Sequence, residues 1–308
     1  VPHVADPDFT LYVGDARDVL RELPDESVHS VLTSPPFYGL RDYGVEGQIG
    51  LEATPEEWVE RLVAVFREAR RVLRRDGTLW IEVGDSYNAY NGNRGPSGSL
   101  SAAADASRNE TPRGLTTGAL KPKDLLMTPF RLAMALQADG WWMRQIIVWH
   151  KPNGMPESAT DRCTTAHSYV FLLARSARYY FDAAAISEPA EWARWGDQTV
   201  PKYEGTDTAA GWIKPKAKGE LVARGGRTTN GQKGRTDERR GFDNRMEYEG
   251  GRKNPRSVWT TPTQGYPGAH FATWPEELAR RMILAGTSER GCCPECGAPW
   301  ERVAEREA

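Results

Sequence analysis

The sequence predicts an α/β fold in which a parallel sheet carries helices on its faces. Residues 9–83 alternate strand-like and helix-like segments, the rhythm of βαβ units. The chain has 308 residues, 39% of them hydrophobic, which is enough to bury a sizeable core. No apolar run approaches the length of a membrane span. We therefore expect one large domain that carries an insert.

Each element of this fold is predicted from its apolar period and its flanking residues. The first half supplies, in order, a strand at 9–13, a helix at 16–23, a strand at 27–33, a helix at 55–73, a turn at Asp76-Gly77 and a strand at 78–83. The second half supplies a helix at 128–138, strands at 143–150, 168–174 and 179–181, and a helix at 275–285. Pro55, Glu56 and Glu57 suit the start of the longest helix.

Two segments interrupt the alternation. Residues 88–123 are rich in Gly, Ser, Ala and Asn, which predicts a mobile loop. Residues 187–256 are polar and Gly-rich, with aromatic residues between many basic ones. Composition alone favours a solvated insert there, and a nucleic-acid surface is the alternative. The predicted layout is a catalytic α/β part at 1–186, the insert at 187–256, a return to the catalytic part at 257–290 and a Cys-containing tail at 291–308.

The peptide from Thr33 to Phe37 lies where a site is expected, because ligands bind beyond the carboxyl ends of strands in open α/β sheets. Pro35 and Pro36 fix the backbone and leave carbonyls without neighbouring amide donors. Ser34 adds a hydroxyl, and Phe37 adds a flat face that suits stacking on a base. Alone, such a tetrapeptide is a weak signal that also fits a proline-rich turn.

Five segments in one consistent order make the signal specific. They are 11–15 with 27–32, then 33–37, 77–85, 139–153 and 268–275. Together they resemble the S-adenosylmethionine-dependent DNA amino-methyltransferases, in the β-type, circularly permuted branch, whose catalytic motif is [Asp/Asn/Ser]-Pro-Pro-[Tyr/Phe]. The resemblance implies a doubly wound, Rossmann-like methyltransferase sheet. It leaves the basic insert as the target-recognition region of an enzyme that methylates a flipped base in DNA.

The chemistry follows from the weak nucleophilicity of an exocyclic amine, whose lone pair is delocalised into the ring. If Ser34 Oγ and the Pro35 carbonyl held its two hydrogens, the lone pair could point at an electrophilic methyl group. Ser34, Pro35, Pro36 and Phe37 are therefore the predicted catalytic residues. Serine at the first motif position favours cytosine N4, with adenine N6 as the alternative. A non-catalytic DNA-binding remnant and an RNA or protein amide methyltransferase are alternatives of other classes.

The resemblance also implies ligand-binding residues. Those expected beside the cofactor, S-adenosylmethionine, are Asp15, Thr33, His270, Phe271, Ala272 and Thr273. Those expected to contact DNA are Lys214, Lys216, Arg224, Arg227, Lys233, Arg235, Arg239 and Arg240. The net charge of −2 means that DNA contact must come from such a local patch. The family's glycine-rich cofactor loop is absent from the sequence, which predicts an incomplete chain that continues past Ala308.

The cysteines do not form the framework of a small secreted domain. Cys293-Pro-Glu-Cys296 is half of a zinc ribbon, so Cys293 and Cys296 are predicted to bind structural zinc in a longer chain. Free thiols in a tail are the alternative. We expect a reducing, cytoplasmic setting in a bacterial or phage-encoded protein, with no membrane partner.

Overall fold

The computed structural model describes residues 2–6, 8–88, 121, 123–189, 252–266 and 273–302. The chain divides into two compact units, residues 1–186 with 255–308 and residues 187–254. In the second unit the described residues form an antiparallel ladder between β7 (Glu188–Pro189) and β8 (Arg252–Lys253). The predicted loop at 89–120, and residues 190–251 of the predicted insert, lie outside the described residues. The first unit holds every other element.

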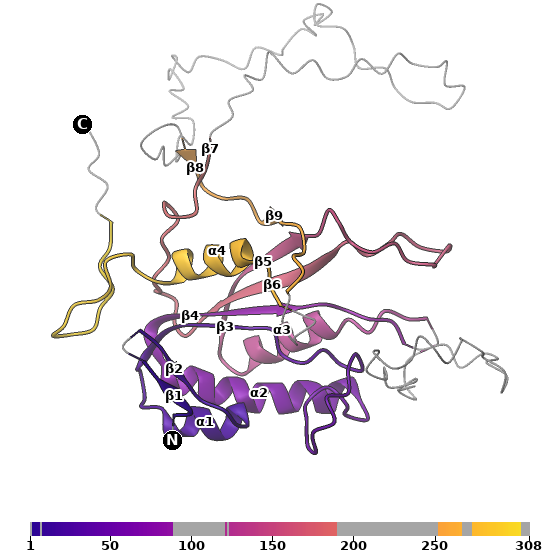
Figure 1. Ribbon diagram of the computed structural model, residues 1–308, viewed down its shortest axis with the longest axis horizontal. Helices are drawn as coiled ribbons and strands as arrows, with labels where there is room; N and C mark the ends of the chain where they lie inside the picture. The colour runs from indigo at the N-terminus through magenta and orange to yellow at the C-terminus, as the bar shows by residue number, and fades with distance from the viewer. Residues whose placement is uncertain are drawn as a thin grey trace, which may run out of the picture. The chain divides into compact units, whose positions relative to one another are not determined.

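A five-stranded sheet forms the centre of the first unit (Figure 1). Its strands, in spatial order, are β3 (Val28–Thr33), β4 (Leu73–Val83), β6 (His167–Ala174), β5 (Trp142–His150) and β9 (Val258–Thr260). Four of the five run in the same direction, and β6 runs opposite to both of its neighbours. We call the edge at which β3, β4, β5 and β9 end the carboxyl edge, and the opposite edge the amino edge.

The expectation of a parallel sheet holds for β3, β4, β5 and β9 and is wrong for β6. The segment 151–166 joins β5 directly to β6 without a crossover helix, and consecutive strands joined in this way pair antiparallel. Because β6 lies between β4 and β5, those two strands are parallel to each other. Residues that follow β3, β4 and β5 consequently meet at the carboxyl edge.

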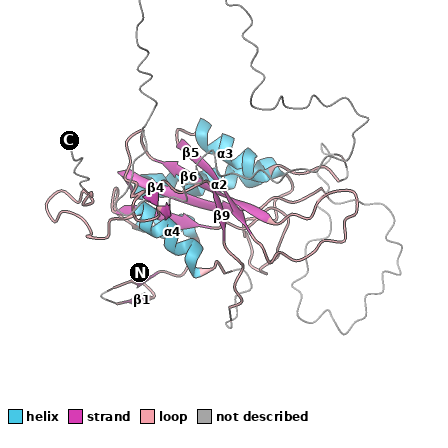
Figure 2. Cartoon of the chain, turned by 90° about the horizontal axis from the view of Figure 1, so that it is seen from above, coloured by secondary structure: helices cyan, strands magenta, loops and turns pink. Residues whose placement is uncertain are grey.

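Helices cover both faces of the sheet (Figure 2). The helices α2 (Pro55–Val72) and α3 (Thr128–Ala138) pack on one face, and α4 (Glu276–Gly286) packs on the other. Side chains of a strand alternate between faces, so Ile81 joins the core with α2 while Trp80 joins the core with α4. The same alternation gives Glu82 to the face covered by α4.

Local sequence explains the helix ends. Thr54 Oγ1 accepts a hydrogen bond from the Glu57 amide at 3.2 Å and caps α2, which begins at Pro55. The short helix α1 (Ala16–Glu22) is capped by Asp15 and packs on α2. The predicted helices at 16–23, 55–73, 128–138 and 275–285 are confirmed to within a residue at each end. The strands predicted at 27–33, 143–150 and 168–174 are confirmed as well.

Three local predictions are wrong. The expected strand at 9–13 is reduced to β2 (Thr10–Leu11), which pairs with β1 (Val4–Ala5) outside the central sheet. Residues 179–181 are not a strand, although the side chains of Tyr179 and Phe181 still pack against the core on the α4 face. The expected turn at Gly77 lies inside β4, where a β-carbon would come 2.9 Å from the His29 carbonyl oxygen. No helix in the described ranges is both long and apolar enough to cross a bilayer.

Candidate active site

Ser34 lies at the carboxyl edge, directly after β3, where it is exposed to solvent. Its hydroxyl donates a hydrogen bond of 2.8 Å to Oε2 of Glu82, a residue of β4 that is only 4% exposed. Trp274 Nε1 donates a longer bond of 3.4 Å to the same oxygen. Glu82 therefore bonds to two segments that are far apart in the sequence. One contains Thr33 and Ser34, and the other contains Thr273 and Trp274.

The backbone of the motif is held by α2. The Pro36 carbonyl accepts a hydrogen bond of 2.9 Å from the indole nitrogen of Trp58, which is fully buried. Tyr38 packs edge-on against Trp58 with ring centroids 6.4 Å apart, and its hydroxyl donates to the Ala53 carbonyl at 3.2 Å. Burial, together with nearby carboxylates, raises the pKa of Tyr38 to about 12, so this hydroxyl remains a donor. Pro35 is buried beneath the segment. These contacts with Trp58 and Tyr38 therefore fix the conformation of the motif.

Phe37 packs against the chain that leaves β4. A β-carbon at Gly84 would come 2.9 Å from Phe37 Cε2, so the ring lies directly on this glycine. The next residue, Asp85, uses Oδ1 to accept from the amide and hydroxyl of Thr128, both at 3.1 Å, at the start of α3. Its other oxygen, Oδ2, is buried and has no partner in the described part of the chain. Burial raises the pKa of Asp85.

Lys151 brings a positive charge to the same edge, immediately after β5. Its side chain is half-buried, and Nζ lies 4.1 Å from the centre of the Trp149 ring. Burial lowers the pKa of Lys151, and the negative charge of Glu82 partly opposes this effect. No hydrogen bond or ion pair of Nζ is found within the described ranges.

Sequence reasoning missed Glu82, Trp274 and Lys151 as site residues. A signal was present for two of them: Glu82 interrupts an otherwise apolar buried strand, where an unpaired charge would be costly, and Lys151 directly follows one. No comparable signal marks Trp274.

Comparison with known proteins identifies this arrangement. The sequence profile of the N6/N4 methyltransferase family, described as DNA methylase, matches residues 28–293. The chain belongs to this family. The matched range contains the Ser34 motif, Glu82, Lys151 and Trp274.

Relatives and a solved structure agree with the family. The methylase is 41% identical over 279 residues to the type II methyltransferase M.Cfr9I of Citrobacter freundii, covering 90% of this chain and 72% of the relative. It is 38% identical over 282 residues to M.SmaI of Serratia marcescens, covering 91% and 76%. The solved PvuII DNA methyltransferase, named as cytosine-N4-specific, shares the fold with a TM-score of 0.50 and 12% identity, over 91% of this chain and 70% of the other. The Rossmann-like methyltransferase sheet is thereby confirmed, and the methylase acts on DNA.

The other predicted ligand-binding residues are distributed as follows. Asp15 caps α1, and hydrogen bonds from the Arg17 side chain and amide lower its pKa to about 2. Thr33 and Thr273 are half-buried and directly precede Ser34 and Trp274, the two residues that bond Glu82. Outside the described residues lie His270, Phe271 and Ala272, as well as Lys214, Lys216, Arg224, Arg227, Lys233, Arg235, Arg239 and Arg240.

The two predicted zinc ligands lie in a tight hairpin. The Cys293 amide donates to the Ala298 carbonyl and the Gly297 amide donates to the Cys293 carbonyl, both at 2.8 Å. Backbone hydrogen bonds from Cys296 and Glu295 lower the pKa of Cys293. Within the described residues no three potential metal ligands are grouped together. Zinc binding by Cys293 and Cys296 therefore stays a prediction.

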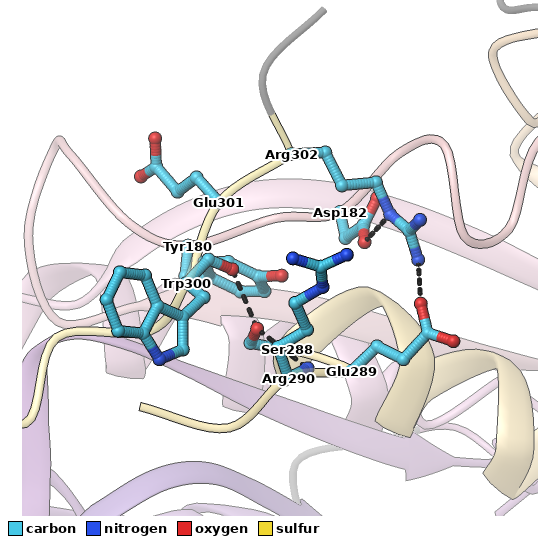
Figure 3. A pocket seen from close by; sticks show the side chains of 8 residues that line it. All are labelled: Tyr180, Asp182, Ser288, Glu289, Arg290, Trp300, Glu301 and Arg302. Atoms are coloured by element: carbon cyan, nitrogen blue, oxygen red, sulfur yellow. Dashed lines mark hydrogen bonds and ion pairs between the residues drawn. The ribbon is translucent and has the colours of Figure 1, made fainter. Parts of the chain in front are cut away.

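A cavity of about 780 Å³ lies at the amino edge, away from Ser34 (Figure 3). The Tyr180 amide donates to the Asp76 carbonyl near the start of β4, which fixes this location. Polar groups in the lining bond one another: Arg302 contacts Asp182 at 2.7 Å and also pairs with Glu289, while Ser288 donates to the Trp300 carbonyl at 2.7 Å. The cavity contains none of the predicted site residues. Position and chemistry therefore favour the carboxyl edge as the active site.

Proposed function

We propose that the methylase transfers a methyl group to N4 of a cytosine that is flipped out of duplex DNA and bound beside Ser34. The observation that carries the proposal is the hydrogen bond from the Ser34 hydroxyl to the buried Glu82 carboxylate. Serine at this motif position supports cytosine over adenine. The setting we propose is the bacterial cytoplasm, where DNA is accessible.

The Ser34–Glu82 pair fits the needs of an exocyclic amine. Because Ser34 gives its own hydrogen to Glu82, the lone pairs of Oγ remain available to accept an N–H of the substrate. The Pro35 carbonyl would accept the second N–H. Held in this way, the amine can direct its lone pair at the methyl group, and catalysis comes from positioning and fixed dipoles.

The same pair offers a route for the proton that the amine must lose after methylation. The amine proton passes to Ser34 Oγ as the serine hydroxyl proton passes to Glu82, so one N–H bond breaks and one carboxyl O–H bond forms. Trp274 supports the carboxylate from the side of α4. Phe37, fixed on Gly84, would offer its ring to the face of the flipped base.

The methyl donor in this proposal is S-adenosylmethionine, which supplies an electrophilic methyl group when it is bound. The described residues fit one end of it. Asp85, which follows Gly84, has in Oδ2 a buried acceptor without a partner in the described chain, and it suits an N–H or O–H donor. Thr33 and Thr273, which directly precede the Glu82 partners Ser34 and Trp274, add two hydroxyls. We assign Asp15 to capping α1, because Arg17 already occupies its carboxylate.

The test is Ser34→Ala in the enzyme, assayed for methyl transfer from labelled cofactor to DNA. Loss of one acceptor from the site should lower the rate roughly a hundred- to a thousand-fold. Cofactor affinity should hardly change, and Ser34→Thr, which keeps a hydroxyl, serves as the matched control. Near-full activity of Ser34→Ala would refute the mechanism. Nucleoside analysis of the product should give N4-methylcytosine, and N6-methyladenine would refute the choice of base.

The target-recognition role of residues 187–256 is a second part of the proposal. Its support is composition, since cations for phosphates and aromatics for bases alternate along this segment. Replacing Arg239 and Arg240 with Gln should weaken binding to all DNA sequences alike and flatten the dependence of affinity on salt. An unchanged salt slope in a titration between low and moderate salt would remove the segment from the DNA contact.

A further inference from the structure

Lys151 has the position and the free hydrogen-bonding capacity of a residue that reads the target base. Its backbone is fixed on both sides, because its amide donates to Ala166 at 2.8 Å and its carbonyl accepts from Gly154 at 3.1 Å. Its side chain is half-buried over Trp149, and that ring is itself held by a 2.8 Å bond from Nε1 to the Thr261 carbonyl. The amine is therefore placed by a rigid support at the carboxyl edge.

This amine lacks an acceptor in the part of the chain that the structure describes, whereas a half-buried amino group ordinarily has one. The charge that opposes the lowering of its pKa is that of Glu82, the carboxylate that binds Ser34. Two other cations of this edge are engaged: Lys123 pairs with Asp161 at 3.0 Å, and Arg162 pairs with Glu157 and covers the Tyr87 ring. Lys151 thus has donor capacity to spare beside the proposed catalytic pair.

The substrate has a matching requirement. In both cytosine and adenine, the ring nitrogen next to the exocyclic amine is an acceptor, so the edge that enters the site shows donor hydrogens beside an acceptor. The Ser34 hydroxyl and the Pro35 carbonyl serve the amine. Trp274 Nε1 is already directed at Glu82. These groups of the site therefore leave the ring nitrogen of the base without a hydrogen-bond donor.

We propose that Lys151 donates a hydrogen bond to the ring nitrogen beside the target amine, N3 of cytosine, and so selects and orients the flipped base. The inference rests on the proposed function, because it requires a base bound beside Ser34. Either protonation state of the amine keeps an N–H to donate, so the lowered pKa of Lys151 does not conflict with this role. A base that lacks the ring acceptor would leave the donor unpaired in a half-buried site.

The experiment compares Lys151→Met with the wild-type enzyme on two duplexes, one with cytosine at the target position and one with 3-deazacytosine, which carries CH in place of N3. On cytosine the variant should lose roughly ten- to a hundred-fold in kcat/KM. On 3-deazacytosine the variant and the wild type should differ by less than about threefold, because the partner is already absent. Taking the ratio of variant to wild type on each duplex cancels the intrinsic reactivity of the analogue. Lys151→Arg, which keeps a donor, should recover part of the loss.

Lys123→Met is the matched control, since it removes a positive charge from the same edge but lies beside Asp161 rather than Glu82. It should show equal, small effects on both duplexes. An equal loss of kcat/KM on the two duplexes for Lys151→Met would overturn the proposal. A uniform loss of DNA affinity with a flatter salt slope would also overturn it, because that result indicates a phosphate contact.

If Lys151→Met unfolds, the ratio of Lys151→Arg to wild type on the two duplexes decides the question. The Ser34→Ala rate is measured independently, so failure of the proposed function is recognised separately. If the product is N6-methyladenine, 1-deazaadenine replaces 3-deazacytosine in the same comparison.

Discussion

Polar side chains at the amino edge of the sheet bond to one another, whereas several at the carboxyl edge keep unused capacity. Around the amino-edge cavity, Arg302 is shared by Asp182 and Glu289, and Ser288 is bonded to the Trp300 backbone. At the carboxyl edge, the Ser34 lone pairs, the Lys151 amine and Asp85 Oδ2 lack partners among the described residues. Several polar groups that line the amino-edge cavity are therefore already paired. Spare hydrogen-bonding capacity, more than cavity size, distinguishes a site that awaits a substrate.

Among the substitutions that compare the two edges, Glu82→Gln should have the largest effect. The charge that accepts the Ser34 proton is lost, although an acceptor oxygen remains, so methyl transfer should fall roughly ten- to a hundred-fold. The measurement is kcat on DNA with saturating cofactor. Glu289→Gln, the same change at the amino edge, should leave kcat unchanged. Equal effects of the two substitutions would erase the distinction between the edges.

The Trp58→Phe substitution tests how the carboxyl edge is supported, because it keeps the core apolar while removing the indole N–H that donates to the motif. The Pro36 carbonyl then loses its partner in the interior, which should lower the free energy of unfolding by about 1–3 kcal/mol. Activity should decline less than for Glu82→Gln, because the motif loosens without losing a reacting group. Urea unfolding and kcat measured on one preparation provide the check. A stability equal to that of the exposed-site control Trp300→Phe would contradict the bracing role of Trp58.

Arg302→Met should have the smallest effect. Its side chain is half-exposed and its pair with Glu289 is screened. The buried Asp182 keeps the hydrogen bond from the Ala185 amide, so the loss of both pairs should cost about 1 kcal/mol. Methyl transfer should remain at the wild-type level while the thermal midpoint falls slightly. A clear loss of activity in this variant would make the amino-edge cavity part of the working site.

Local signals were sufficient for most elements and for the Ser34 motif. Pro55 and the charged first turn marked α2, and Pro35-Pro36 marked the end of a buried strand. The placement of Ser34, Glu82 and Lys151 at one edge of the sheet could not be derived in this way. It depends on β6 lying antiparallel between β4 and β5, and no local period encodes the order of strands. The prediction of a strand at 179–181 failed for the same reason. Apolar residues of this segment pack against the core, but the segment pairs with no neighbouring strand in the described part of the chain.

The β7–β8 ladder has a consequence for how such enzymes diversify. Glu188 and Pro189 pair with Lys253 and Arg252, so everything between them begins and ends at one place. The entropy of closing such a loop grows only slowly with its length. Residues between the two strands can therefore be lengthened, shortened or exchanged during evolution while Ile186 and Pro255 keep their positions in the unit that holds Ser34. If residues 187–256 recognise the target, as proposed, a lineage can in this way acquire a new DNA sequence to modify without altering the chemistry that modifies it.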